Sequence, residues 1–382
     1  MIVCLFFEVP SALTTSSPSS LHRSNLKMCS SFVKSISNEN IWTCDNFEGI
    51  VTEFCQKAAN PRSRLMILTD FDRTLSAYLG KDGNPCEECH DIIFDHCYGG
   101  PAWKNEVDDL WDQTDRRFRG LSTMTEEKQV AVHDWWWKAA NDLMKRGRLT
   151  REQLDEAVEA ANTKPRPGCR ELFRECHAAG VPVVIASAGV ADVVERFLLI
   201  NGVELPPPVS AQAASGAGAG RCGGARGGVY VHANRMVFGK EGHVIDFEGP
   251  LVHSRSKGNT FQALRDKHGP IFEDGEDPLV LVLGDSLWDV TSEQGLPGSS
   301  MRLRVGYANS PYDPIPQFRS TFHAVVTGDG DLDLPRQLLR AALDARASAA
   351  SACPAAAAHH TPATDAADGN GSNAAEADSA AA

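Results

Sequence analysis

The stretch Leu65-Met-Ile-Leu-Thr-Asp70-Phe-Asp72-Arg-Thr74-Leu-Ser76 decides which fold this sequence predicts. An apolar run that is bounded by polar residues is typical of a buried parallel strand. Such a strand delivers Asp70 and Asp72 to the loop at its carboxyl end, which is the edge where open α/β sheets bind ligands. Two carboxylates at that edge suit Mg²⁺ and phosphate chemistry, whereas the alternative interpretation is an acidic cap of the next helix.

The composition is that of an ordinary globular protein. The chain has 382 residues, of which 42% are hydrophobic and 23% charged, enough for one large core or two modest ones. Its formal net charge of -13 argues against a nucleic-acid polymer or an anionic membrane as partner, because both attract clusters of Lys and Arg. A nucleotide monomer is compatible with this charge, since a local basic pocket could bind it.

The cysteines and the absence of a long apolar segment indicate the compartment. The 11 cysteines are scattered and odd in number, which favours a reducing environment. No apolar stretch approaches the roughly 20 residues that span a membrane. The opening residues lack the basic start of a signal peptide, and the Ser/Thr-rich segment behind them only loosely resembles a transit peptide. We expect a cytoplasmic location ahead of organelle import, and a monomer as the simplest assembly.

Strands alternate with helices along most of the chain. Amphipathic spacing predicts a helix at 46–57 before the first strand, and another helix at 168–179. The predicted strands are 65–69, 181–187, 279–285 and 324–327. This alternation predicts the α/β class, with a doubly wound, Rossmann-like core.

The pattern between the first two strands changes to helices, which predicts an inserted helical cap domain at 80–164. Thr150 followed by Gln153 is a helix-start signal within it. The cap helices are predicted at 103–118, 125–146 and 150–162. The core then comprises 46–79 and 165–345.

Three segments are not expected to add to this core. They are a poorly ordered N-terminal segment at 1–45, a flexible Gly/Ala insertion at 206–228, and a disordered Ala-rich tail at 346–382.

Polar residues that suit phosphate chemistry recur at four strand or loop ends. After the first pair of aspartates, Ser187 leaves the second strand, Lys257 lies in a later loop, and Asp285 and Asp289 follow the third strand. Taken singly, they are better explained as helix caps and solvated charges. Together and in this order they resemble the phosphohydrolases of the haloacid dehalogenase superfamily. That resemblance implies that Asp70 attacks phosphorus to form an aspartyl phosphate.

The same resemblance implies that Asp72 protonates the leaving oxygen and later activates water. A phosphate monoester repels an anionic nucleophile, so the attack needs Mg²⁺ and donors around the phosphate oxygens. We expect Asp70, the backbone carbonyl of Asp72, and Asp285 to hold Mg²⁺. Asp72 would work best if its pKa were raised.

Three further residues complete the expected site. Lys257 supplies a positive charge, and Ser187 supplies a hydrogen bond to the phosphate. Asp289 is expected to hold Lys257 or a metal-bound water in position without binding the metal itself.

A closer resemblance lies in the flanking sequence. The segments Cys86-Glu-Glu-Cys89-His90, Ser187-Ala-Gly189 and Leu251-Val-His253 look like those of the cytosolic pyrimidine 5′-nucleotidases of type III, over roughly residues 46–340. This resemblance implies hydrolysis of UMP and CMP, with 7-methylguanosine monophosphate accepted by one branch and phosphoryl transfer to nucleosides by some members. It also implies that Ser187, Ala188 and Lys257 contact the substrate.

The base-binding part of the cap departs from that family. Asp115 is the nearest counterpart of an acidic residue that helps to recognise the base, and Ala139 replaces a serine used for methylguanine. Trp135, Trp136 and Trp137 are adjacent, and helix residues lie ~100° apart, so the three indoles cannot share one buried face. We expect Trp135 and Trp136 to contact the base, which would favour a cationic 7-methylguanine; the alternative is that they anchor the core.

The segment from Cys86 to His90 also has the spacing of a zinc site, and buried thiols near the cap hinge are the alternative that we favour. The sequence as a whole predicts a Mg²⁺-dependent nucleoside 5′-monophosphate phosphatase. Two alternatives stay open: a superfamily phosphatase for another small phosphate such as phosphoserine, and a nucleotide-binding protein without turnover.

Overall fold

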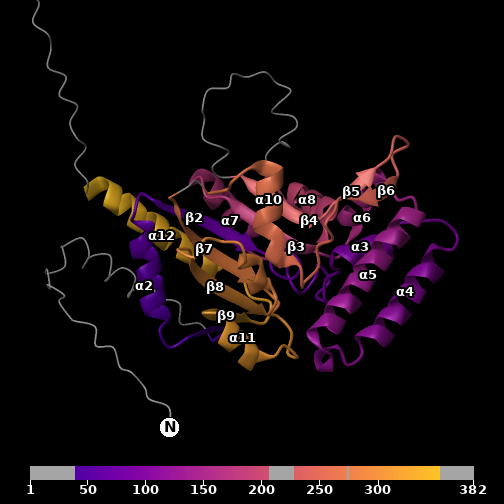
Figure 1. Cartoon of the computed structure of the whole chain (residues 1–382), viewed down its shortest axis with the longest axis horizontal. Coiled ribbons are helices and arrows are strands. Elements are labelled where there is room, and N and C mark those ends of the chain that lie inside the picture. Colours follow the sequence, from indigo (N-terminus) through magenta and orange to yellow (C-terminus); the bar gives the residue numbers. More distant parts are fainter. Residues whose placement is uncertain (1–38, 206–227, 273–274, 353–382) are drawn as a thin grey trace, which may run out of the picture.

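The structure is a computed structural model that describes residues 39–205, 228–272 and 275–352 (Figure 1). The predicted Gly/Ala insertion lies outside the described residues except for Gly228, and so do residues 1–38 and 353–382 of the two predicted terminal segments. Among the described helices, none is both long enough and apolar enough to cross a membrane.

A seven-stranded sheet forms the centre of the described chain. In spatial order its strands are β1 (Ile41–Thr43), β9 (Ala324–Thr327), β8 (Met301–Ala308), β7 (Asp277–Gly284), β2 (Ser63–Thr69), β3 (Val183–Val190) and β4 (Val229–Asn234). All neighbours are parallel except β1, which pairs antiparallel with β9. The predicted α/β fold with a parallel sheet is confirmed, although β1, β4 and β8 were not predicted.

Both faces of the sheet are covered, which explains why β2 is a continuous apolar run. Successive side chains of a strand point to opposite faces. Leu65 and Ile67 belong to a large core cluster with one set of helices, and Met66 and Leu68 belong to a second cluster on the other face. The first face carries α2 (Phe47–Ala58), α7 (Cys169–Ala178), α8 (Ala191–Ile200) and α12 (Asp333–Ala352), and the second carries α10 (Thr260–His268) and α11 (Ile315–Thr321).

The chain winds outward in two directions from β2. β3 and β4 lie on one side of β2, and β7, β8 and β9 lie on the other side. The strand order therefore reverses between β2 and β7. Ligands of open α/β sheets bind at the carboxyl ends of such strands. Thr69 pairs with Leu283 of β7 and with Ile185 of β3, which brings the residues after these strands to one place.

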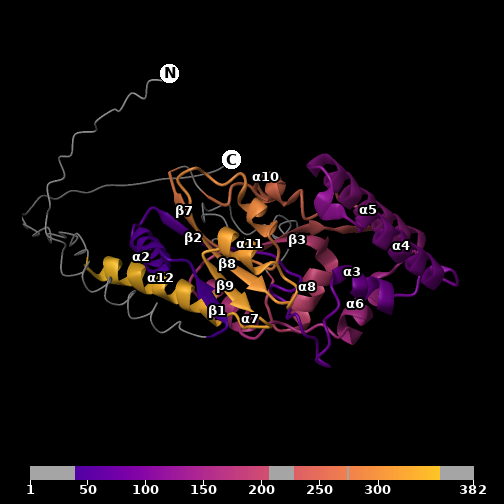
Figure 2. The ribbon, with the colours of Figure 1, turned by 90° about the horizontal axis from the view of Figure 1, so that it is seen from below.

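Of the α-helices between β2 and β3, the four that precede α7 form what we call the helical insertion. They are α3 (Cys89–His96), α4 (Trp103–Phe118), α5 (Glu126–Arg146) and α6 (Arg151–Ala160). Figures 1 and 2 both show them at the opposite end of the molecule from α2 and α12. The predicted start of α6 is confirmed, because Thr150 Oγ1 accepts from the Gln153 amide at 3.2 Å and Gln153 Oε1 accepts from the Thr150 amide at 3.0 Å. A small hairpin of β5 (Met236–Phe238) and β6 (Val244–Phe247) contacts α5.

Two expected boundaries of order were wrong. Strand β1 lies within the segment 1–45 that was expected to be poorly ordered, because it gains backbone partners in β9 that a three-residue pattern does not reveal. At the other end, α12 continues to Ala352, beyond the expected end of the core at 345. Alanine favours helix, and Arg346 fixes this last part by donating to the carbonyl oxygens of Ala58 and Ser63.

Candidate active site

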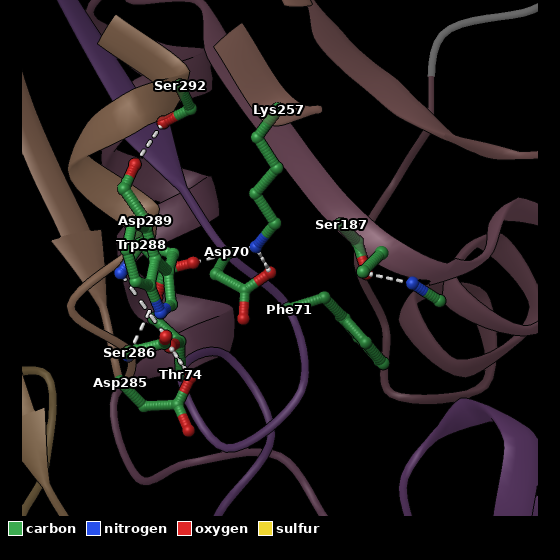
Figure 3. A network of polar contacts seen from close by, with 12 residues as sticks. Asp70, Phe71, Thr74, Ser187, Lys257, Asp285, Ser286, Trp288, Asp289 and Ser292 are labelled. Carbon is green, nitrogen blue, oxygen red and sulfur yellow. Dashed lines mark hydrogen bonds and ion pairs between the residues drawn. The ribbon is translucent and has the colours of Figure 1, made fainter. Parts of the chain in front are cut away.

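A buried lysine joins two of the predicted aspartates (Figure 3). Lys257 lies in a short 3₁₀ turn and is only 3% exposed. Its Nζ donates to Asp70 Oδ1 at 2.6 Å and to Asp289 Oδ1 at 2.7 Å. Burial lowers the pKa of Lys257, but the two carboxylates outweigh it and the net shift of the pKa is upward, so the ammonium stays charged. Asp289 thus contacts Lys257, as the sequence predicted.

Three carboxylates converge at the ends of β2 and β7. Oxygens of Asp70, Asp285 and Asp289 all lie within 4.8 Å of one another, and this is the one such potential metal-binding group among the described residues. Asp285 also accepts from Thr74 Oγ1 at 3.3 Å, and Asp289 Oδ2 accepts from the Ser286 amide at 2.8 Å. The side chain of Asp72 is not part of this group. The expected contribution of its backbone carbonyl to the metal site stays a prediction.

The charges of this group fit a divalent cation. Burial, and then Asp289 and Asp70, raise the pKa of Asp285 well above its usual range. Burial raises the pKa of Asp289 to about 6, although Lys257 opposes the shift. Buried carboxylates that repel one another are costly, and a hard cation with oxygen ligands, such as Mg²⁺, would remove that repulsion. Asp70 and Asp285 are therefore suited to hold Mg²⁺, with Asp289 beside them.

Asp72 is held by the first residue of the helical insertion. The backbone amide of Cys89 donates to Asp72 Oδ1 at 3.1 Å. Burial, and then Glu88 and Asp70, raise the pKa of Asp72 well above its usual range, so its carboxyl group can carry a proton to donate. Gly189 makes room for this contact, because a Cβ there would lie 2.5 Å from Cys89 Sγ and 3.1 Å from Asp72 Oδ2.

The cysteines of the predicted zinc alternative do not form a ligand group with His90. Cys86 Sγ donates to the Ala77 carbonyl at 2.7 Å, and burial raises the pKa of the Cys86 thiol to about 12. His90 packs edge-on against Trp136, with ring centroids 4.6 Å apart. Burial lowers the pKa of His90 to about 3, so this ring is neutral.

Ser187 and Ala188 lie at the end of β3. Ser187 is 1% exposed, and its Oγ accepts from the Gly189 amide at 3.0 Å, so it lies behind the cavity wall. Ala188 borders the cavity, and its carbonyl accepts from Trp137 Nε1 at 2.6 Å and from Asn234 Nδ2 at 2.9 Å. The hydrogen bond from Trp137 joins α5 of the helical insertion to the sheet.

A cavity of about 340 Å³ opens beside these residues. The aspartates and Lys257 form its sheet side. Its other side, which we call the aromatic wall, consists of Trp111, Phe118, Trp136 and Trp137, with His90 and Thr114 among them. Two further acids, Glu88 and Asp91, also border the cavity. One part of the cavity is therefore suited to phosphate and a cation, and the other to a flat ring.

The residues that were predicted to contact the base differ in their position relative to the cavity. Trp136 lines the cavity, but Trp135 does not; the guanidinium of Arg117 covers its ring at 4.2 Å. The ~100° step along α5 turns Trp136 and Trp137, and not Trp135, towards the cavity, so nothing here supports the predicted contact between Trp135 and the base. Asp115 does not line the cavity either, and pairs with Arg119 at 2.7 Å.

Sequence reasoning also missed the contribution of α4. Trp111, Thr114 and Phe118 are spaced three and four residues apart, which puts them on one face of a helix. That spacing is visible in the sequence and could have identified this face. Glu88 had no such signal, because its segment was assigned to thiols or zinc.

The comparisons with known proteins agree with this geometry. The family model described as "Pyrimidine 5'-nucleotidase (UMPH-1)" matches residues 73–206 and 224–343, about two-thirds of the chain. The 7-methylguanosine phosphate-specific 5′-nucleotidase of Gallus gallus is 26% identical over 286 residues, which are 73% of this chain and 88% of the relative. Its namesake from Homo sapiens is 24% identical over 285 residues, covering 72% of this chain and 84% of the relative.

Among solved structures, cytosolic 5′-nucleotidase IIIB bound to cytidine superimposes with a TM-score of 0.63 and 21% identity. The superposition covers 82% of this chain and 97% of that one, and shows that the two share a fold.

Mg²⁺ is expected to raise the melting temperature of the protein, and more at about pH 8 than at about pH 6. Asp285 and Asp289 have raised pKa values in the folded protein, so at lower pH they hold protons that compete with the metal. Mg²⁺ at a hundred times its Kd should stabilise the fold by about 2.7 kcal/mol. Thermal unfolding with Mg²⁺ or chelator measures the effect.

Asp285→Asn should lose most of this stabilisation. Asp91→Asn is the matched control, since Asp91 borders the cavity outside the carboxylate group. A melting temperature that does not respond to Mg²⁺ at either pH would contradict the assignment.

Proposed function

Because this chain belongs to the pyrimidine 5′-nucleotidase (UMPH-1) family, we propose that it is a Mg²⁺-dependent 5′-nucleotidase that acts through an aspartyl phosphate. The proposed substrates are UMP, CMP and 7-methylguanosine monophosphate. The observation that carries the proposal is a single cavity with Asp70, Lys257 and Asp285 on one side and the aromatic wall on the other. We further propose a monomer in the cytoplasm.

Asp70 is the proposed nucleophile. In the first step, an Asp70 oxygen attacks phosphorus and the bond from phosphorus to the nucleoside O5′ breaks. Lys257 can balance negative charge on the phosphate, since it lies 2.6 Å from Asp70 Oδ1. Bound Mg²⁺ would polarise the phosphate oxygens and lessen their repulsion of the carboxylate.

Asp72 is the proposed acid and base. It gives its proton to O5′ as the nucleoside leaves, and then takes a proton from the water that attacks the phosphorus of the intermediate. That attack breaks the bond between phosphorus and Asp70, which releases phosphate and restores the carboxylate. The raised pKa of Asp72 supports the first of these roles, and the Cys89 amide keeps one of its oxygens in place.

The aromatic wall supports a nucleoside as the leaving group. Nucleobases stack on aromatic side chains, and a cationic ring such as 7-methylguanine is also attracted to their electron-rich faces. Asp91 adds negative charge at the cavity, which favours a positive ring further, whereas Glu88 is paired with Arg73 at 2.9 Å. The names of the relatives in Gallus gallus and Homo sapiens agree with such a substrate.

Asp70→Asn is expected to abolish turnover, because an amide cannot act as the nucleophile. Asp72→Asn should slow nucleotide hydrolysis by about 10²- to 10⁴-fold, the usual contribution of a positioned acid or base. Phosphate release by the purified variants measures both effects, and circular dichroism checks the fold. Near-normal turnover by Asp70→Asn would end its assignment as nucleophile.

A substrate panel tests the proposed reaction directly. Phosphate release is measured from UMP, CMP, 7-methylguanosine monophosphate, AMP, GMP and phosphoserine, each with Mg²⁺ and with chelator. We expect chelator-sensitive release from the pyrimidine or methylguanine nucleotides. Release from phosphoserine alone would refute the nucleotidase proposal, and binding of a nucleotide without release from any substrate would show a non-catalytic protein.

Trp111→Leu should raise KM for the preferred nucleotide by about tenfold, the value of a lost stacking contact, with a smaller change in kcat. Trp135→Leu is the matched control, because Trp135 is also partly buried but does not line the cavity. Ribose 5-phosphate, which has no base, should be hydrolysed equally by the wild type and Trp111→Leu. An equal rise in KM for both substrates would refute a contact between Trp111 and the base.

A further inference from the structure

We propose that Arg166 is a positioning residue that fixes the loop after Asp72 so that Asp72 can protonate the leaving group. The proposal rests on the proposed function, since it concerns the proton donor of that reaction. Arg166 lies just before α7, is 1% exposed, and is the largest side chain among the fully buried residues. Nothing in its sequence context had marked it as part of the site.

The guanidinium of Arg166 is directed at backbone carbonyl oxygens of the loop that follows Asp72. Its Nε donates to the Thr74 carbonyl at 2.7 Å, and its Nη2 donates to the Arg73 carbonyl and to Asn309 Oδ1. The Arg166 backbone amide donates to the Leu75 carbonyl at 2.9 Å. One residue thus binds three consecutive carbonyl groups immediately beyond Asp72.

Burying this charge is costly, and its surroundings compensate it mainly through neutral oxygen acceptors. The Asp329 carboxylate lies 3.6 Å from Nη1, and the ring of Tyr307 lies 4.3 Å below the guanidinium carbon. Nη1 also donates to the Gly330 carbonyl. A carboxylate at this distance is no close bidentate partner, so most of the compensation comes from carbonyl groups. A residue needed only for packing would not require a charge in this position.

The loop that Arg166 holds is strained. Arg73 has a φ of 55°, in the left-handed region that residues other than glycine rarely adopt. Its carbonyl accepts from Arg166 and from Asn309 Nδ2 at 2.9 Å, and its amide donates to Ser76 Oγ at 2.7 Å. Such a conformation persists only where several contacts enforce it. Because Asp72 directly precedes Arg73, relaxation of this φ would redirect the Asp72 carboxyl group.

The consequence for catalysis depends on the leaving group. The O5′ of a nucleoside is a poor leaving group that needs the Asp72 proton, whereas p-nitrophenolate leaves without one. The ratio kcat/KM reports the steps up to the departure of the leaving group, and so it isolates this difference. A misdirected Asp72 should therefore slow nucleotides much more than p-nitrophenyl phosphate.

The test compares kcat/KM of Arg166→Met on the preferred nucleotide and on p-nitrophenyl phosphate. We expect a loss of about 100-fold or more on the nucleotide and less than about tenfold on the aryl phosphate, with Asp72→Asn showing the same contrast. Arg346→Met is the matched control. Arg346 is half-buried and also donates to two backbone carbonyl groups, those of Ala58 and Ser63, but near the start of β2 and not at the end that leads to the loop. This variant should therefore leave the ratio between the substrates unchanged.

Asn309→Ala provides a second variant in case Arg166→Met does not fold. It removes the other side-chain donor to the Arg73 carbonyl. It should also lower kcat/KM more on the nucleotide than on p-nitrophenyl phosphate, but by a smaller factor than Arg166→Met. If Arg166→Met lowers kcat/KM equally on both substrates while Asp72→Asn lowers it much more on the nucleotide, the role of Arg166 is overturned and that of Asp72 is not. If Asp72→Asn itself shows no contrast, the assignment of Asp72 as the acid falls, and the proposal for Arg166 falls with it.

Discussion

The ion pairs of Lys257 with Asp70 and Asp289 are the interaction on which the rest of the site depends. Three parts of the chain meet in them: the end of β2, the turn at Lys257, and the 3₁₀ helix η3 (Asp289–Glu293). Without this ammonium, the carboxylates of Asp70, Asp285 and Asp289 would face one another with less positive charge nearby, an arrangement that burial makes unfavourable. One lysine does not neutralise three carboxylates, and this imbalance is why the group suits a divalent cation.

Much of this arrangement could be predicted from the sequence because it depends on strand periodicity. β2, β3 and β7 contain apolar runs with polar residues at or near their carboxyl ends, and parallel strands place those ends together. Asp70, Lys257, Asp285 and Asp289 therefore converge as their order along the chain indicated. β8 escaped prediction because Arg302 and Arg304 interrupt its apolar pattern, and both pair with Glu293 of η3, a contact that sequence does not reveal.

The cavity side of the helical insertion was harder to predict, because it depends on how the helices pack. Three adjacent tryptophans in α5 limit which of them can face a ligand, but the rotation of α5 against the sheet decides among them. The hydrogen bond from Trp137 to Ala188 fixes that rotation, and its partner is 51 residues away in the sequence. Similarly, Glu88 borders the cavity only because α3 begins beside Asp72.

The hydrogen bond from the Cys89 amide to Asp72 also limits how such a protein can be redesigned. An insertion that selects substrates looks like a module that could be exchanged between related proteins. Here the first turn of α3 belongs to the proposed reaction centre as much as to the insertion, because the Cys89 amide donates to an oxygen of Asp72. A graft that moved α3 to admit a larger base would shift that oxygen as well. A change of substrate range made in this way would therefore also change the reaction rate.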